Sequence, residues 1–281
     1  AAIPAVADDS DATTNAATPS EPLNGMFAGA MTYDSTSKVY TLTADTVVTL
    51  KDDVTLTQVK FVGKNYTLTF KSEGTTNKTL TYTYDDAQGT AIDAMFSVKE
   101  VVFDHVDAEI DSTASGKTVA ATATDNSGAK FRVFDSDVEI KSATVTVSQS
   151  GWNGRVMTTK TLTMADENAK LVLDKANSSI IVADMSNGAT LEIRNPNFSA
   201  GCIKGSVVDS TISVTGAAKG ILYIYPNTQT GNESTEINDS TITTDGTVAL
   251  YTAGYDYNLD AAGTTIEAKN VVVEKCSNGD G

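Results

Sequence analysis

Oxygen-bearing side chains recur at alternating positions in one segment near the C-terminal end of the sequence. Asp256, Asn258 and Asp260 supply three of them, and Glu267 falls twelfth when Asp256 is counted first. Oxygen ligands at the first, third, fifth and twelfth positions are typical of a calcium-binding loop. The sixth position is Ala261 instead of the usual glycine, and the flanks are typical of strands. The segment suits either a calcium site or an Asp/Asn-rich turn; the sequence requires no cofactor and suggests only calcium.

Aromatic side chains form a second group that could bind a ligand. Tyr223 and Tyr225 alternate along one strand-like run, so their side chains share a face. Tyr251 lies 28 residues beyond Tyr223. Tyrosine combines an apolar ring face with a polar hydroxyl, so such a strip is a stacking platform for sugar rings, with interior or edge packing as the alternative. The other aromatic candidates for carbohydrate binding lie in predicted loops: Tyr255, Tyr257 and Trp152.

Groups suited to catalysis are sparse. Arginine occurs only at Arg132, Arg155 and Arg194, and His105 is the only histidine. A catalytic histidine needs a nucleophile or an orienting partner in a defined site, and the sequence contains no Gly-x-Ser-x-Gly elbow. Adjacent carboxylates such as Asp52 and Asp53 point to opposite faces of a strand and are typical of turns. We therefore predict no catalytic residue, and the sequence favours a protein that is not an enzyme.

A repeated sequence motif, here called the repeated phrase, indicates which elements position these groups. Asp209-Ser-Thr-Ile-Ser-Val214 returns thirty positions later as Asp239-Ser-Thr-Ile-Thr-Thr244, and Asp135-Ser-Asp-Val-Glu-Ile140 is a looser copy. Such repetition is typical of stacked units that bury their apolar faces against one another. Alternating Thr and Val indicate strands, and no stretch shows a helical period. We predict an all-β solenoid with Asp and Ser in the turns and Ile inside. Asp135, Asp209 and Asp239 then either form one stack or each cap their own turn.

Short strands alternate with turns along most of the chain. Similar anchor residues recur 24 to 31 positions apart, the longest interval being from Phe103 to Phe134. A β-sandwich would also give closely spaced strands, but it gives no reason for one phrase to recur at coil distance. Thr-x-Thr units begin at Thr41, Thr55, Thr67 and Thr81. Residues 26–90 suit either an N-terminal antiparallel cap or irregular first coils.

The short Val/Ile strands, the Asn-Asp-Ser-Thr-Ile phrase ending at Ile242 and the variable turns resemble the right-handed parallel β-helix of the pectin-lyase-like superfamily. More narrowly, they resemble the non-enzymatic β-helix repeats of bacterial cell-surface proteins. The resemblance covers roughly residues 54–276 and implies an extracellular setting and a carbohydrate-facing surface. It also implies an alternative activity, because enzymes of this fold cleave polysaccharides with an Arg or Lys base and bound calcium, or with clustered Asp residues.

Charge and composition limit the classes of partner that the protein can bind. With 20 basic and 36 acidic residues, the chain has a formal net charge of −16. Nucleic-acid binding needs clustered Lys and Arg, so no nucleic-acid partner is expected. No apolar run approaches the ~20 residues of a membrane helix, so no membrane insertion is expected. Residues 1–25 are small, polar and acidic, which predicts a flexible tether left after removal of a signal peptide, followed by one solenoid domain over 26–281.

We therefore expect a secreted or cell-surface, non-catalytic β-helix protein that acts as an adhesin or binds carbohydrate. The expected partner is a polysaccharide or a glycan of a host or cell surface. Two alternatives stay open: a polysaccharide lyase or glycoside hydrolase of the same fold, and a structural stalk. No capping helix is predicted after the run Val271-Val-Val273, which suggests a further domain or anchor beyond the open strand edge.

Overall fold

The computed structural model describes residues 20–85, 93–113, 131–149, 155–176, 179–197, 199–217, 220–225, 235–253 and 259–276. Within these ranges the regular elements are strands, and no helix is long and apolar enough to cross a membrane. In chain order the strands are β1 (Phe27–Ala28), β2 (Met31–Asp34), β3 (Val39–Leu42), β4 (Thr46–Leu50), β5 (Val54–Thr57), β6 (Lys60–Ser72), β7 (Lys78–Asp85), β8 (Asp93–Asp104), β9 (Val106–Thr113), β10 (Phe131–Phe134), β11 (Asp137–Lys141), β12 (Thr144–Gln149), β13 (Arg155–Met164), β14 (Lys170–Asp174), β15 (Ile180–Met185), β16 (Thr190–Arg194), β17 (Gly201–Val208), β18 (Thr211–Thr215), β19 (Ile221–Ile224), β20 (Thr235–Asn238), β21 (Thr241–Ala253), β22 (Leu259–Asp260) and β23 (Thr265–Cys276).

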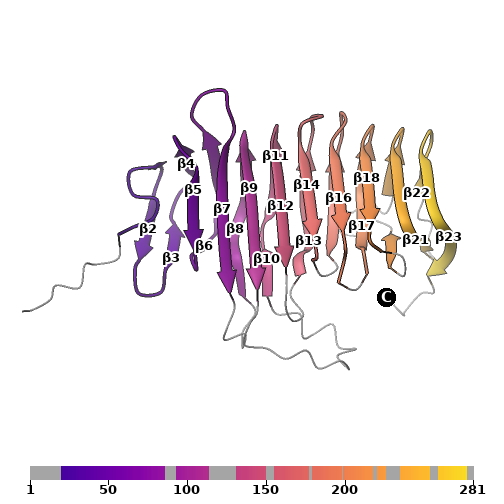
Figure 1. Cartoon of the computed structure of the whole chain (residues 1–281), viewed down its shortest axis with the longest axis horizontal. Helices are drawn as coiled ribbons and strands as arrows, with labels where there is room; N and C mark the ends of the chain where they lie inside the picture. Colours follow the sequence, from indigo (N-terminus) through magenta and orange to yellow (C-terminus); the bar gives the residue numbers. More distant parts are fainter. Residues whose placement is uncertain are drawn as a thin grey trace, which may run out of the picture.

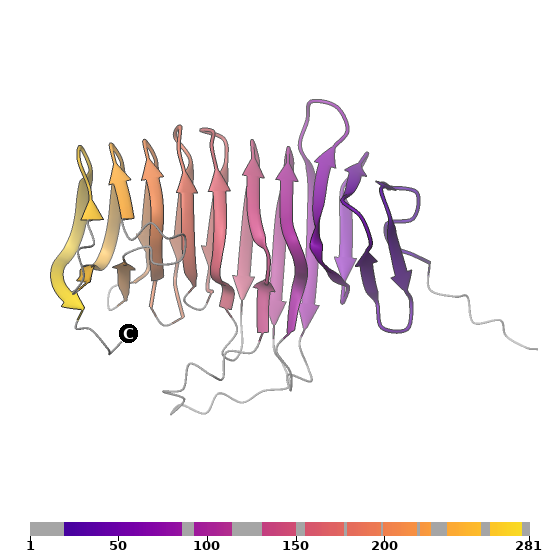
Figure 2. The same cartoon turned by 180° about the vertical axis from the view of Figure 1, so that it is seen from behind.

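Three columns of parallel strands run along the long axis of the molecule (Figures 1 and 2). The first column contains β3, β10 and β19, the opening residues of β6, β8, β13, β15 and β17, and the final residues of β21 and β23. The second contains β4, β11, β20 and β22 with the final residues of β6, β8, β13, β15 and β17. The third contains β5, β7, β9, β12, β14, β16 and β18 with the opening residues of β21 and β23.

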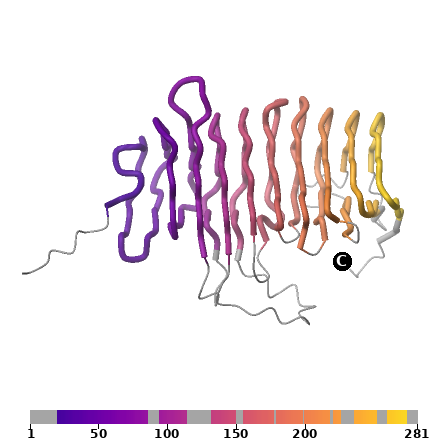
Figure 3. Tube along the Cα trace, viewed as in Figure 1, coloured from indigo at the N-terminus to yellow at the C-terminus, as the bar shows by residue number. Residues whose placement is uncertain are grey.

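The chain passes through the first, second and third column in turn and then begins the next coil. The trace in Figure 3 shows these coils stacked from the indigo N-terminal end to the yellow C-terminal end. Each strand pairs with strands one coil before and one coil after it, so the backbone hydrogen bonds run along the stack. This arrangement confirms the all-β prediction and is compatible with a β-helix.

The N-terminal end pairs differently from the rest of the stack. There β1 pairs antiparallel with β4, and β2 pairs antiparallel with β3. The other strand pairs of the described residues are parallel, beginning with the pairing of β3 and β4 to β6. Of the predicted cap segment 26–90, the described residues 26–85 thus combine an antiparallel end with coils that already pair in parallel.

The repeated phrase lies at the corner between the second and third columns. Asp209 and Asp239 have φ angles of 46° and 50°, a left-handed conformation that Asp and Asn adopt more readily than most residues. Two positions after each corner serine, the isoleucines Ile212 and Ile242 pair in register and are buried in the core. The prediction that Asp turns the chain and Ile fills the interior is therefore confirmed for these two copies.

The looser copy lies at a different corner, so the predicted stack of three aspartates is wrong. Asp135 follows β10 in the first column, and the Ile140 of its phrase pairs with Phe103 in the second column. At that corner Asp135 forms ion pairs with Lys64 at 3.5 Å and with Lys160 at 3.2 Å. Similar turn residues serve more than one corner of the coil, and local sequence does not distinguish them.

A ladder of hydroxyl groups supports the corner between the second and third columns. The Oγ of Ser240 accepts a hydrogen bond from the Ser210 amide at 3.1 Å and donates to the carbonyl of Asn238 at 2.8 Å. The Ser240 amide donates in turn to the Oγ1 of Thr264 at 3.2 Å. Both serines are buried, so these hydroxyls satisfy backbone groups that water cannot reach.

We expect Ser240→Ala to lower the free energy of unfolding by about 1–3 kcal/mol, because it leaves the buried Ser210 amide without its acceptor. Urea unfolding followed by circular dichroism measures the change. Ser213→Ala is the matched control, since Ser213 faces outward between Ile212 and Val214, and its effect should stay within about 0.5 kcal/mol. Equal losses in the two variants would contradict a specific role for the ladder.

Aromatic side chains fill the interior of the N-terminal coils. Phe96 stacks on Phe61 with ring centroids 5.4 Å apart and on Phe134 with centroids 5.2 Å apart. Phe70 and Phe103 form a second stack at 5.8 Å. In register these rings occupy equivalent positions of successive coils, so each ring is held between the coil before and the coil after.

Candidate binding surface

Three of the predicted tyrosines come together on the outer face of the first column. The rings of Tyr225 and Tyr251 are stacked, with centroids 4.7 Å apart and an interplanar angle of 3°. The ring of Tyr223 lies 5.8 Å from that of Tyr225 and 5.6 Å from that of Tyr251, tilted by 42° to each. All three side chains are half-buried, so part of each ring is open to solvent.

The strand pairing explains this stack. Leu222 and Ile224 of β19 point into the core, so Tyr223 between them points outward. Ile224 pairs with Leu250 of β21 on the next coil, which places Tyr225 and Tyr251 one residue further along, opposite each other. Neighbouring strands lie ~4.8 Å apart, which matches the distance between the two stacked rings.

The coil before the tyrosines contributes a lysine. In β17, Cys202 pairs with Tyr223 and Ile203 pairs with Ile224, so Lys204 falls in the row of Tyr225. The Tyr225 amide donates to the Ile203 carbonyl at 3.0 Å, which continues this register. We call Lys204, Tyr223, Tyr225 and Tyr251 the tyrosine–lysine surface.

Lys204 is unusual among the cations of this acidic protein. It is 9% exposed, and burial lowers the pKa of its ammonium group. Within the described residues no carboxylate forms an ion pair with it. Six other cationic side chains do pair with carboxylates, at distances of 3.8 Å or less: Lys64, Lys71, Lys141, Lys160, Lys170 and Arg194.

Cys202 lies beside Lys204 as a free, half-buried thiol. Burial raises the pKa of this thiol to about 12, although the nearby charges of Lys204 and Arg155 act in the opposite direction. At neutral pH the thiol is therefore protonated. A protonated thiol is a poor nucleophile, so Cys202 contributes packing and not reactivity to this surface.

The predicted calcium ligands are only partly described. Asp256 and Asn258 lie outside the described residues, as do Tyr255, Tyr257 and Trp152. Asp260 is in β22 of the second column and accepts a hydrogen bond from the Ala262 amide at 3.2 Å, as expected in a turn. Glu267 is in β23 of the third column, opposite Thr243. In the described part of the chain no three acidic, His or Cys side chains group to hold a metal ion, and calcium binding stays a prediction.

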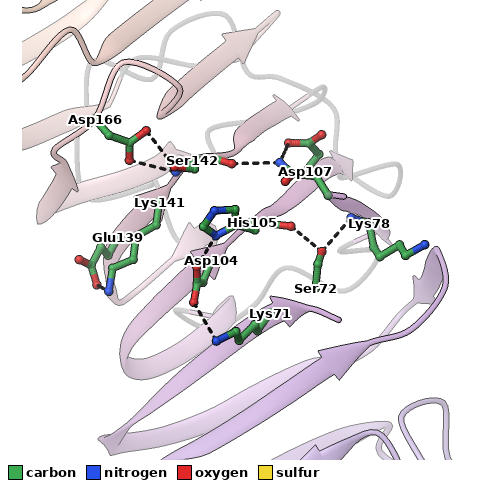
Figure 4. A network of polar contacts seen from close by, with 11 residues as sticks. Lys71, Ser72, Lys78, Asp104, His105, Asp107, Glu139, Lys141, Ser142 and Asp166 are labelled. Carbon is green, nitrogen blue, oxygen red and sulfur yellow. Dashed lines mark hydrogen bonds and ion pairs between the residues drawn. The ribbon is translucent and has the colours of Figure 1, made fainter. Parts of the chain in front are cut away.

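The only histidine belongs to a structural network at the corner between the second and third columns (Figure 4). His105 has a φ angle of 54°, and its Nδ1 lies 2.7 Å from an oxygen of Asp104. Nearby, Asp166 accepts hydrogen bonds from the amide of Ser142 at 3.0 Å and from its hydroxyl at 3.2 Å, and Asp107 accepts from the Thr144 amide at 2.8 Å. These contacts hold backbone corners together, and no hydroxyl or thiol among the described residues approaches the imidazole as a nucleophile would.

The alternation of Tyr223 and Tyr225 predicted their shared face, but sequence reasoning missed Lys204. The available signal was its place in Cys202-Ile-Lys204, where a lysine alternates with a cysteine on the outward side of a strand. An outward lysine is usually solvated, so that pattern alone does not indicate burial.

The fold and the surface together define a class: an elongated all-β protein of stacked parallel strands with an aromatic cluster on one outer face. No protein-family model matches the chain, and searches of curated proteins and of solved structures found no match either. Function is therefore inferred from the geometry of the tyrosine–lysine surface.

Proposed function

We propose that this chain is a right-handed parallel β-helix of a secreted or cell-surface protein. It is non-catalytic and binds a polysaccharide or a cell-surface glycan through the tyrosine–lysine surface, as an adhesin or a carbohydrate-binding module. The right hand follows the strong preference for right-handed connections between parallel strands. The extracellular location follows from the strong acidity and from the resemblance to cell-surface β-helix repeats.

One observation supports carbohydrate binding above the others: the three tyrosine rings from two adjacent coils contact one another at an outer face. A sugar ring presents apolar C–H groups on one face and hydroxyls at its edge. Tyrosine suits both, because the ring offers an apolar face and the hydroxyl offers a hydrogen-bonding group. A rigid β-sheet holds such rings in place before the ligand arrives, which reduces the entropy lost on binding.

A glycan array identifies the ligand, and titration calorimetry then tests the surface. We expect Tyr225→Ala and Tyr251→Ala each to weaken binding by about tenfold or more, the equivalent of ~1.4 kcal/mol, since each removes a stacking face. Tyr66→Ala is the matched control, because Tyr66 is a half-buried tyrosine of β6 in the N-terminal coils, and its affinity should equal that of the native protein.

The same samples separate the alternatives. A reducing-end assay on the bound glycan detects cleavage, and release of sugar would replace the binding proposal with a polysaccharide lyase or glycoside hydrolase. Absence of binding across the array would favour the structural stalk. Equal affinities of Tyr225→Ala, Tyr251→Ala and the native protein would show that the glycan binds elsewhere on the molecule.

A further inference from the structure

We propose that the ammonium group of Lys204 binds an acidic group of the ligand, so that the tyrosine–lysine surface selects glycans bearing carboxylate or sulfate. This inference rests on the proposed function of the tyrosines and specifies the chemical class of the glycan. The carboxylate or sulfate forms the ion pair that no described residue of the protein supplies, and the sugar ring that bears it stacks on the neighbouring tyrosines.

Lys204 has a buried charge with no carboxylate partner among the described residues. It is 9% exposed, and the neighbouring Cys202 thiol is protonated and supplies no negative charge. Removing an ammonium group from water is unfavourable unless an anion compensates it, which is why buried cations are normally paired. The chain has 36 acidic residues, yet none of the described ones pairs with Lys204. This departs from the rule that buried cations are paired, and a binding role for Lys204 explains the departure.

The position of Lys204 beside the tyrosines also favours this role. Lys204 and Tyr225 follow the paired residues Ile203 and Ile224, so they lie on adjacent coils in one row. Tyr251 continues the same row on the next coil, and its ring is stacked on that of Tyr225. With coils spaced ~4.8 Å apart, the cation and the two rings succeed one another along the stack axis at intervals close to the length of a sugar unit. A glycan lying along this axis can place a ring on the tyrosines and its acidic group at the lysine.

The overall charge of the protein makes a local cation necessary for binding an acidic glycan. A net charge of −16 repels polyanions in general, so the protein does not bind them through its overall field. Selection of an acidic glycan therefore needs a local cation that the ligand desolvates on contact. A charge-assisted hydrogen bond in such a site is stronger than one between neutral groups.

Two matched pairs of ligands test the inference by titration calorimetry. The first is hexagalacturonate against its fully methyl-esterified form, and the second is dextran sulfate against dextran, so that carboxylate and sulfate are tested separately. We expect the native protein to bind at least one acidic member about tenfold or more tightly than its neutral counterpart. That preference should shrink as salt is raised, because ions screen the interaction.

Lys204→Met should abolish the preference for the acidic member while retaining binding to the neutral one. Lys204→Arg should keep part of the preference, since the charge remains. Lys99→Met is the control, because Lys99 is an exposed lysine of β8 far from this surface in sequence, and it should leave both affinities unchanged. Lys204→Met should also unfold at the same temperature as the native protein or higher, since it removes a buried unpaired charge.

Each result decides between the proposals. Equal binding of acidic and neutral members by the native protein, with the tyrosine variants still weakened, would overturn the role of Lys204 and keep the proposed function. Loss of both ligands in Lys204→Met would overturn it too, because the lysine would then only support the rings. No binding of any of the four ligands or of any arrayed glycan would overturn both proposals.

Discussion

Phe96→Ala should lower the free energy of unfolding by about 3–5 kcal/mol, among the largest losses that a single side chain in this protein can cause. Phe96 is fully buried between Phe61 and Phe134, with centroid distances of 5.4 and 5.2 Å. Its ring also meets the edge of Tyr82 at 5.4 Å. The substitution removes apolar area from the core and leaves a cavity between coils that the hydrogen-bonded backbone cannot close.

The measurement is urea unfolding monitored by circular dichroism. Phe27→Ala is the matched control, because Phe27 is a half-buried residue of β1 at the N-terminal end, and it should cost clearly less. Phe96→Leu should recover part of the loss by filling some of the cavity. If Phe96→Ala and Phe27→Ala destabilised the protein equally, the aromatic stack would not be a main source of its stability.

The cavity should also affect cooperativity. In a stack of coils each unit contacts mainly its neighbours, so stability is close to a sum over units and their interfaces. Phe96 lies in the interface between the coils of β6, β8 and β10. A broader or two-step unfolding transition in Phe96→Ala would show that the coils on each side of this interface separate as units.

The all-β architecture could be predicted from the sequence because strand alternation and turn chemistry are local properties. Alternation places Ile212 inward in β18, and the preceding Asp209 tolerates the left-handed corner. Both features depend on a few neighbouring residues. The same locality explains the wrong alignment of Phe103 with Phe134, since the structure pairs Phe134 with Phe96 and Phe103 with Ile140.

The Thr-x-Thr units show why the coil length was harder to predict. The unit at Thr41 belongs to the first column and the unit at Thr67 to the second. The units at Thr55 and Thr81 belong to the third column and pair with each other. Their regular spacing therefore reflects the number of residues between strands of different columns, and not the length of one coil. A Thr-rich strand suits any of the three half-buried sheets.

The candidate site was predictable only where one strand determines it. Tyr223 and Tyr225 share a face because they alternate within one run, whereas the stack on Tyr251 depends on the register between β19 and β21. The burial of Lys204 depends on a third segment, β17, and on the side chains that surround it. Contacts between coils join residues more than twenty positions apart, and no local pattern specifies their register.

Gly205→Ala should destabilise the protein by about 3 kcal/mol or more, because it combines backbone strain with a clash. Gly205 has a φ angle of 104°, and a Cβ there would lie 2.3 Å from the carbonyl oxygen of Ala183 on the neighbouring coil. That oxygen belongs to the backbone of β15, which is held by parallel pairing on both sides. The clash can be relieved only by moving one coil against the next.

Gly74→Ala separates the two causes. Gly74 also has a positive φ, 85°, but a Cβ there would meet no atom within 4 Å, so only the conformational penalty of about 1–2 kcal/mol should appear. The difference between the two variants in urea unfolding measures the cost of forcing the coils apart. Because Gly205 directly follows Lys204 in β17, Gly205→Ala should also weaken glycan binding, whereas Gly74→Ala should not. Equal stabilities of the two variants would mean that the close contact between Gly205 and the neighbouring coil adds nothing to the cost of a side chain at this position.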